Sequence, residues 1–133
     1  MREILFRGKR CDNGRWVNGS FFASINRIYI FPLVIASAAH KAEIIPETVG
    51  QFTGLADENG KQIFEGDIVE PVLIDGTHKG FSWGRMVVVF DRGAFGLKSR
   101  RGEITPMCNY AANVQFKVWG NIHDNPELME VTE

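Results

Sequence analysis

Two Asn-Gly dipeptides, each set between strand-like runs, constrain the fold of this chain more than any other feature. They are Asn13-Gly14 near the N-terminus and Asn59-Gly60 within the stretch Glu47–Val69. Asn-Gly is favoured in two-residue hairpin loops because both central residues need a positive φ, which Asn and Gly tolerate best. The sequence therefore predicts two β-hairpins, with structural turns at Asn13, Gly14, Asn59 and Gly60.

A third turn is predicted at Glu65-Gly66-Asp67, between the apolar pairs Ile63-Phe64 and Ile68-Val69. A glycine flanked by two acids inside a strand pattern indicates a polar bend or bulge. The Asp67 carboxylate is expected to accept a hydrogen bond from a nearby backbone N–H group. This reading is preferred to a cation site made with Glu70, because Ca²⁺ and Mg²⁺ need about six oxygen ligands.

The second half of the chain repeats short strand patterns separated by turns. Arg85–Phe90 reads as a buried strand, Asp91-Arg92-Gly93 as a turn and Ala94–Lys98 as the next strand. Val114–Trp119 alternates apolar and polar residues with a period of two, which is typical of a half-buried strand. Short strands with closely spaced turns predict a small barrel or sandwich.

Little helix is expected. Asn125 can cap a short terminal helix, with Pro126 at its first position and Glu127 complementing the helix dipole. Leu33–Lys41 is predicted as a second short helix, and Val72–Gly84 as a loop.

The predicted fold class is mostly β with very little helix, in one compact unit over residues 1–133. An N-terminal β-hairpin part is expected over 1–46, and a small SH3-like or OB-like barrel part over 47–133. The core of the barrel part should contain apolar residues from most of its strands. These are Phe52, Ile63, Ile68, Val87, Val89, Leu97, Phe116 and Val118.

Composition adds few constraints on function. The chain has 133 residues, the size of one ordinary domain, and a formal net charge of −1 that predicts no partner by bulk charge. Cys11 and Cys108 form no CxxC motif, so free thiols in a reducing cytoplasm are expected, with a disulfide between them as the alternative. The N-terminus lacks the apolar run of a signal peptide, and no apolar run is long enough to span a bilayer. A soluble cytoplasmic protein without membrane contact is expected.

Residues with catalytic or metal-binding chemistry are scattered. His40, His78 and His123 show no metal-ligand spacing, and no phosphate-binding glycine loop is present. His123-Asp124 could orient an imidazole for acid–base work, but a surface histidine near a helix cap is the preferred reading. The sequence predicts no cofactor and no enzyme. An enzyme of unrecognised type would have to join distant groups such as His40, His123 and Glu47.

A basic stretch with interleaved aromatic residues is the best candidate for a binding surface. Small β-barrels bind single strands by combining basic grooves with stacking aromatics. The alternative is that these basic residues meet the acidic segment Glu43–Asp75, with Phe90 and Phe95 in the core. Trp16 and Trp119 are further candidates for contacts. The candidate nucleic-acid or partner surface is Trp83, Arg85, Arg92, Lys98, Arg100 and Arg101.

Three sequence blocks resemble the YopX family of proteins encoded by bacteriophages and prophages. The blocks are Arg2–Arg10 with Asn13–Gly19, then Pro46–Leu55 with Asn59–Val69, and finally Gly120–Ile122 with Asn125–Leu128. Phe64, Trp119 and His123 depart from the residues that are usual in the family. The resemblance implies a mostly β fold with a small barrel-like C-terminal part, a phage origin, self-association and no known activity.

Three classes of function follow from these observations. The leading one is a non-enzymatic phage or prophage accessory protein in the bacterial cytoplasm, which acts by binding a host or phage protein or by forming a homo-oligomer. The alternative is a nucleic-acid-binding small β-barrel. An enzyme of unrecognised type ranks last.

Overall fold

The computed structural model of this protein describes residues 3–32, 41–74 and 82–130, and it contains two compact units, Met1–Gly54 and Leu55–Glu133. The described residues are mostly strand, with three short 3-10 helices, so the predicted β class with very little helix is confirmed. His40, His78 and all but the last residue of the predicted helix Leu33–Lys41 lie outside the described residues. The division at residues 46 and 47 stays a prediction about folding units.

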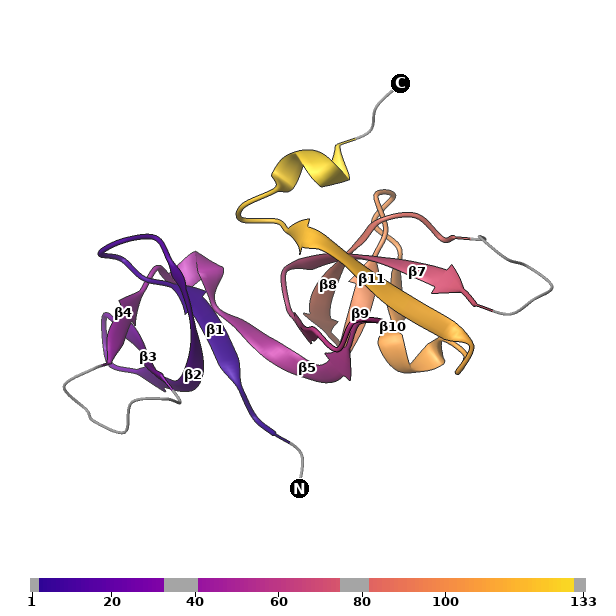
Figure 1. Cartoon of the computed structure of the whole chain (residues 1–133). Helices are drawn as coiled ribbons and strands as arrows, with labels where there is room; N and C mark the ends of the chain where they lie inside the picture. Colours follow the sequence, from indigo (N-terminus) through magenta and orange to yellow (C-terminus); the bar gives the residue numbers. More distant parts are fainter. Residues whose placement is uncertain (1–2, 33–40, 75–81, 131–133) are drawn as a thin grey trace. The chain divides into compact units, whose positions relative to one another are not determined.

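The N-terminal unit is built from four strands and the start of a fifth (Figure 1). The hydrogen-bonded order of the sheet is β4-β3-β2-β1-β5-β6, so the chain meanders from β1 to β4 before β5 pairs with β1 on its other side. The elements are β1 (Phe6–Lys9), β2 (Trp16–Ala23), β3 (Ile28–Pro32), β4 (Ala42–Ile44), the 3-10 helix η2 (Pro46–Thr48) and β5 (Gly50–Ala56), which continues into the C-terminal unit.

The end of β4 returns to the end of β1, which closes the first four strands into a small ring. Ile45 N–H donates to the Lys9 carbonyl at 2.9 Å, and Cys11 N–H donates to the Glu43 carbonyl at 2.9 Å. An antiparallel bridge joins Arg10 to Ile44 between these two bonds. The sequence predicted only a hairpin here and placed the barrel in the C-terminal part. Ring closure was missed because it depends on pairing between residues more than 30 positions apart.

The interior of this ring is narrow. Ile30, Ala42 and Ile44 are buried in it, with Phe6, Val17, Ile28 and Val49 packed around them. A Cβ atom on Gly8 would lie 2.4 Å from Ile44 Cγ2, and one on Gly19 would lie 1.8 Å from the Phe31 carbonyl oxygen. Glycine at both positions therefore lets neighbouring strands approach closely.

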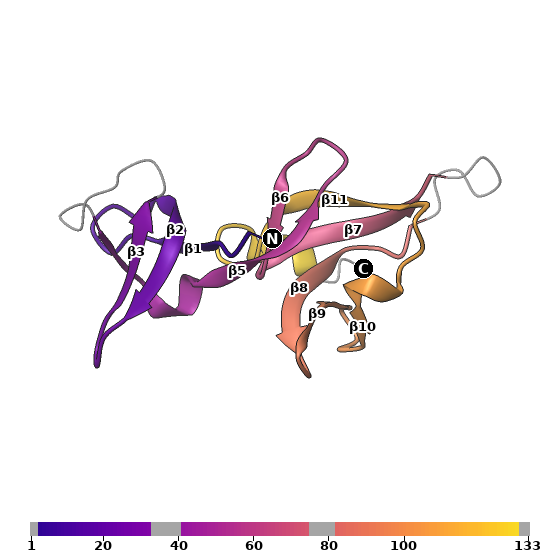
Figure 2. The same ribbon diagram turned by 90° about the horizontal axis from the view of Figure 1, so that it is seen from below.

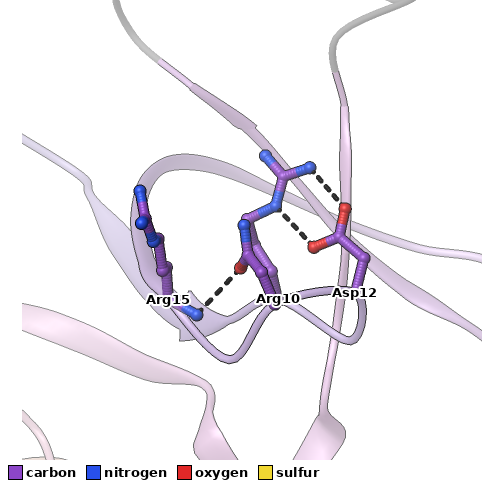
Figure 3. A network of polar contacts seen from close by, with 4 residues as sticks. Arg10, Asp12 and Arg15 are labelled. Atoms are coloured by element: carbon purple, nitrogen blue, oxygen red, sulfur yellow. Dashed lines mark hydrogen bonds and ion pairs between the residues drawn. The ribbon is translucent and has the colours of Figure 1, made fainter.

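The predicted hairpin at Asn13-Gly14 is present, but its loop is longer than two residues. β1 pairs antiparallel with β2, and Arg10 N–H donates to the Arg15 carbonyl at 2.9 Å, which leaves residues 11–14 as the loop. Gly14 has a φ of +70°. Asn13 does not have a positive φ, because Arg92 is the only non-glycine residue with one in the described ranges. Arg10 clamps Asp12 in a bidentate ion pair at 2.9 and 2.7 Å (Figure 3). Asp12 is exposed and Arg10 is half-exposed, so solvent screens the pair and it contributes little to stability.

The C-terminal unit contains a five-stranded antiparallel sheet with the order β10-β9-β8-β7-β11 (Figure 2). The sheet ends at β10 and β11, so the predicted barrel is not closed. Val72 and Leu73, predicted as loop residues, belong to β7. The elements are β6 (Gln62–Phe64), β7 (Asp67–Leu73), β8 (Met86–Asp91), β9 (Ala94–Lys98), β10 (Ile104–Pro106), η3 (Met107–Asn109), β11 (Val114–Asn121) and η4 (Pro126–Met129).

The core of this unit confirms part of the predicted set. Ile63, Ile68 and Leu97 are buried, and Phe116 and Val118 pack against the core half-buried. The face of β8 was predicted wrongly, because an all-apolar run gives no alternation by which to choose a face. The residues that enter the core are Met86 and Val88, while Val87, Val89 and Phe52 are half-buried and lie outside that cluster.

The alternative interpretation of the basic stretch, which placed Phe90 in the core, is wrong for this residue, because Phe90 is 55% exposed at the end of β8. Its ring meets Phe95 edge-on, with centroids 5.2 Å apart. Phe95 is half-buried and packs against the core.

Turn chemistry in the C-terminal unit differs from the prediction in one respect. At Asn59-Gly60, Asp57 N–H donates to the Lys61 carbonyl at 2.8 Å, so the loop is 58–60 and Gly60 alone of the two residues has positive φ. The two-residue loop with two positive φ angles occurs instead at Arg92-Gly93, where Asp91 pairs with Ala94. The predicted turns therefore exist, and the sequence missed their lengths.

The bend at Glu65-Gly66-Asp67 is confirmed. Gly66 has φ +88°, and Phe64 N–H donates to Asp67 Oδ2 at 2.8 Å. The terminal helix is also present as η4, although Asn125 does not cap it with its side chain. Asn125 Oδ1 instead accepts a hydrogen bond from Asn121 N–H at 3.3 Å.

Candidate functional site

Four of the six predicted surface residues line one groove of about 400 Å³ in the C-terminal unit. Trp83 and Arg85 immediately precede β8, and Arg100 and Arg101 follow β9. The register Val87–Lys98 places the start of β8 beside the end of β9, which brings the two pairs to the same end of this hairpin. We call this hollow the basic groove.

The other two predicted residues lie elsewhere. Arg92 is in the turn at the opposite end of the β8–β9 hairpin, beside a separate hollow of about 200 Å³. Lys98 is exposed on β9, opposite Val87 and Ile104, and it does not line the groove. The prediction therefore grouped Arg92 and Lys98 with residues from which the fold of the β8–β9 hairpin separates them.

A second hollow, of about 460 Å³, adjoins the basic groove and is lined partly by aromatic rings. Trp83 and Tyr110 form its aromatic walls, with ring centroids 5.6 Å apart and planes at 88°. Ser99, Glu103, Thr105 and Asn109 bring polar groups to it. The two hollows share Trp83, Met86, Ser99 and Glu103, so they form one continuous concave surface. We call the second hollow the aromatic pocket.

Tyr110, one wall of this pocket, contacts two further side chains. Its hydroxyl lies 3.6 Å from Met86 Sδ, and its ring packs edge-on against Phe116 with centroids 5.6 Å apart. Burial raises the pKa of Tyr110 above its ordinary value of 10.0. The ring therefore stays uncharged at neutral pH and offers a π surface together with a hydroxyl group.

Glu70 on β7 accepts hydrogen bonds from two side chains near Arg85. Trp119 Nε1–H donates to Glu70 Oε1 at 2.9 Å, and the Ser82 hydroxyl donates to Oε2 at 2.6 Å. The pKa of Glu70 is lowered from 4.5, first by the Ser82 hydrogen bond and then by the Trp119 hydrogen bond and the charges of Lys117 and Arg85, against the opposing effect of burial. The carboxylate is therefore charged at neutral pH.

Trp119 holds two cations close to this carboxylate. The Arg85 guanidinium carbon lies 4.4 Å from the Trp119 ring centroid, and Lys117 Nζ lies at the same distance. Stacking on an indole ring restricts a long side chain that solvent would otherwise leave mobile. The position of Arg85 at the groove is thus set by Trp119. The charge of Arg85 also contributes to the lowered pKa of Glu70, a residue of the acidic segment.

Sequence reasoning did not find Tyr110 as a residue of the pocket, or Glu70 and Lys117 as neighbours of Arg85 and Trp119. The period-2 pattern of Val114–Trp119 does place Lys117 and Trp119 on one face. What it could not give is the register, in which Lys117 lies directly opposite Glu70.

The loop between β9 and β10 is a tight turn with internal hydrogen bonds. Ser99 N–H donates to the Glu103 carbonyl at 2.8 Å, and Glu103 N–H donates to Ser99 Oγ at 3.2 Å. Gly102 has φ +90° within it. Arg100 reaches the Leu128 carbonyl at 3.2 Å, whereas Arg101 is exposed on the groove.

The structure also places the residues considered for other chemistry. Among described residues, no group of three or more His, Cys, Asp and Glu side chains could hold a metal ion. Cys11 and Cys108 are exposed free thiols. His123 N–H donates to Asn121 Oδ1 at 3.0 Å, while Glu47 is exposed in the N-terminal unit. In that unit Trp16 packs under the Arg7 guanidinium, 4.6 Å from its ring centroid.

No helix in the described ranges has the length and apolarity needed to cross a bilayer. The fold and the concave surface define a small, mostly β protein with an open sheet and a basic, aromatic-lined hollow at one end of a hairpin.

The chain belongs to the YopX family, because the family model described as YopX protein matches residues 5–130. The crystal structure of protein YopX from Bacillus subtilis is similar, with 19% sequence identity and a TM-score of 0.58. The similarity covers 98% of this chain and 100% of that one, and it supports the fold. The comparison with curated proteins found no match.

Proposed function

We propose that this chain is a non-enzymatic binding protein whose basic groove binds single-stranded nucleic acid. The observation that carries the proposal is the continuity of the groove with the aromatic pocket through Trp83. Single-strand binders combine cations that follow the phosphate backbone with aromatic rings on which bases stack. This geometry favours nucleic acid over the protein partner that the sequence ranked first.

Two features make the groove suited to phosphate. Arg85 is held in place by Trp119, so less of its conformational entropy is lost on binding. Arg101 projects from the tight turn between Ser99 and Glu103. The net charge of −1 leaves the rest of the chain with no general attraction for polyanions, so binding should depend on this local cluster.

The test is fluorescence anisotropy with labelled single- and double-stranded DNA and RNA, at low and then moderate salt. Arg101→Glu should weaken single-strand binding by about tenfold or more, and the affinity of the unaltered chain should fall with salt. Arg92→Glu is the matched control, since it makes the same charge change at the other end of the hairpin. Absence of salt-sensitive binding, or equal losses in both variants, would contradict the proposal.

Self-association is a second candidate, supported by an exposed aromatic cluster on β2 and β3. Phe22 is 50% exposed, and its ring centroid lies 6.3 Å from those of both Tyr29 and Phe31. Apolar rings gathered on one sheet face are typical of interaction surfaces. Light scattering after size exclusion would test this: a dimer that Phe22→Ser converts to monomer supports it, and a monomer at all concentrations contradicts it.

We further propose that the chain is encoded by a phage or prophage and works in the cytoplasm of the bacterial host, where it would meet host or phage partners. Membership of the YopX family and two exposed free thiols support this setting. Fractionation of cells that express the chain would test it, and recovery with the membrane or the medium would contradict it.

A further inference from the structure

We propose that the aromatic pocket is a base subsite that selects guanine, with the phosphate of the same nucleotide at Arg85 and Arg101. This inference rests on the proposed function and specifies which part of the ligand enters which hollow. It assigns Trp83 and Tyr110 to stacking, and Glu103 to reading the edge of the base.

The size and walls of the pocket suit one nucleobase with its ribose. Its volume of about 460 Å³ lies within the range of about 300–1,000 Å³ that is usual for small-ligand sites. Trp83 is 40% exposed in the wall of the pocket. The perpendicular Tyr110 ring forms a second wall at 88° to it. A flat aromatic ligand can therefore lie on one ring and meet the edge of the other.

Glu103 gives the pocket its selectivity. It is the acidic residue among the four that line both hollows, so it adjoins the arginines of the one and the aromatic rings of the other. A carboxylate at this position repels phosphate, so it fits a role in accepting hydrogen bonds from the ligand rather than in holding its backbone. Guanine presents two adjacent donors, N1–H and the N2 amino group, to the two oxygens of one carboxylate. Adenine, cytosine and uracil offer no such pair on their Watson–Crick edges.

The turn between β9 and β10 sets the spacing between base and phosphate. Arg101 lies in the three-residue loop 100–102, which the two hydrogen bonds between Ser99 and Glu103 close, so Glu103 is two residues away from it. Arg85 approaches the groove from the start of β8 and is held by the Trp119 ring. Arg100 is directed to the Leu128 carbonyl, so the phosphate role falls to Arg85 and Arg101.

Isothermal titration calorimetry with GMP, AMP, CMP, UMP and inorganic phosphate tests the inference on the full chain. GMP should bind about tenfold more tightly than AMP, because a bidentate contact discriminates by about that factor or more. Trp83→Ala should weaken GMP binding about fivefold or more through lost stacking. Glu103→Gln should bring the affinities for GMP and AMP close together, while Glu58→Gln, in the exposed 58–60 loop, should leave them unchanged.

The variants remain informative if one of them folds poorly, because their circular dichroism and thermal unfolding are compared first, and the four nucleotides can be ranked on the unaltered chain. GMP-dependent shifts of the Trp83 indole and Tyr110 NMR signals, absent with inorganic phosphate, would support the base subsite. Equal affinity for all four nucleotides, or for phosphate alone, would overturn it. If single strands bind but GMP does not, the base subsite is wrong and the proposed function stands. If neither binds, both are wrong.

Discussion

Thr48 reinforces the closure of the N-terminal ring by accepting a hydrogen bond from the backbone of Lys9, which lies 39 residues away. Lys9 N–H donates to Thr48 Oγ1 at 2.8 Å, and the same hydroxyl donates to the Ile45 carbonyl at 2.6 Å. Thr48 is 7% exposed, so water has little access to replace either bond. One hydroxyl thus joins η2 to β1, at the point where β4 returns to it.

Thr48→Val should destabilise the protein by about 1–3 kcal/mol, because the Lys9 N–H group loses its partner in a buried site. Thr48→Ser keeps the hydroxyl and should cost much less. Urea unfolding followed by circular dichroism measures both. A Val variant as stable as the Ser variant would show that the hydroxyl does not matter.

Gly19→Ala should destabilise the N-terminal unit by about 3 kcal/mol or more. A Cβ atom there would lie 1.8 Å from the Phe31 carbonyl oxygen. A backbone atom cannot move away from this clash as easily as the end of a flexible side chain could. Ser20→Ala, at the neighbouring exposed position, is the control and should be nearly neutral. Thermal unfolding compares the two, and a Gly19→Ala protein with an unchanged midpoint would contradict the close approach of β2 and β3.

Arg92→Asn should stabilise the C-terminal unit by about 0.5–1 kcal/mol. Arg92 has φ +50°, a left-handed conformation that costs most residues about 1–2 kcal/mol and that Asn tolerates better. Its side chain is 94% exposed and makes only a long ion pair of 3.8 Å with Asp91. Arg92→Ala removes the same side chain without a preference for this conformation, so it should give no gain. Chemical denaturation measures the free energy of unfolding of both variants. An equal gain in stability from both substitutions would show that loss of the Arg92 charge, and not the backbone preference of Asn, is the cause.

Glu70→Gln should lower stability at neutral pH and have less effect in acid. The folded state lowers the pKa of Glu70 below 4.5, chiefly through the Ser82 hydrogen bond, so the charged form stabilises the fold above that value. This contribution is lost as the pH falls from about 4.5 through the folded-state pKa. Because the carboxylate is only partly buried and solvent screens its interactions, the effect should be about 1 kcal/mol or less. Unfolding free energies from pH 7 to 3 measure it, with Glu58→Gln as the control, and a difference independent of pH would contradict the assignment.

Local turn chemistry allowed much of the strand pattern to be predicted. Gly60 and Gly66 have positive φ angles, as the turn patterns around them predicted. Asp67 accepts the expected hydrogen bond from a backbone N–H group. Loop length was less predictable. Asn59 adopts no positive φ, because the three-residue loop 58–60 needs one such residue, at Gly60.

The candidate surface could be predicted only in part. Trp83, Arg85, Arg100 and Arg101 come together because β8 and β9 run antiparallel, whereas Arg92 lies at the turn between them. Tyr110 and Glu103 join the hollow through later elements, and no spacing in the sequence indicates this. The sequence by itself determined the β class, the turn positions and the supply of basic and aromatic side chains, since these depend on neighbouring residues and on a period of two. The tertiary structure decided the closure of β4 onto β1, the face of β8 that is buried and the set of residues that share the groove, because each depends on the register between strands far apart in the chain.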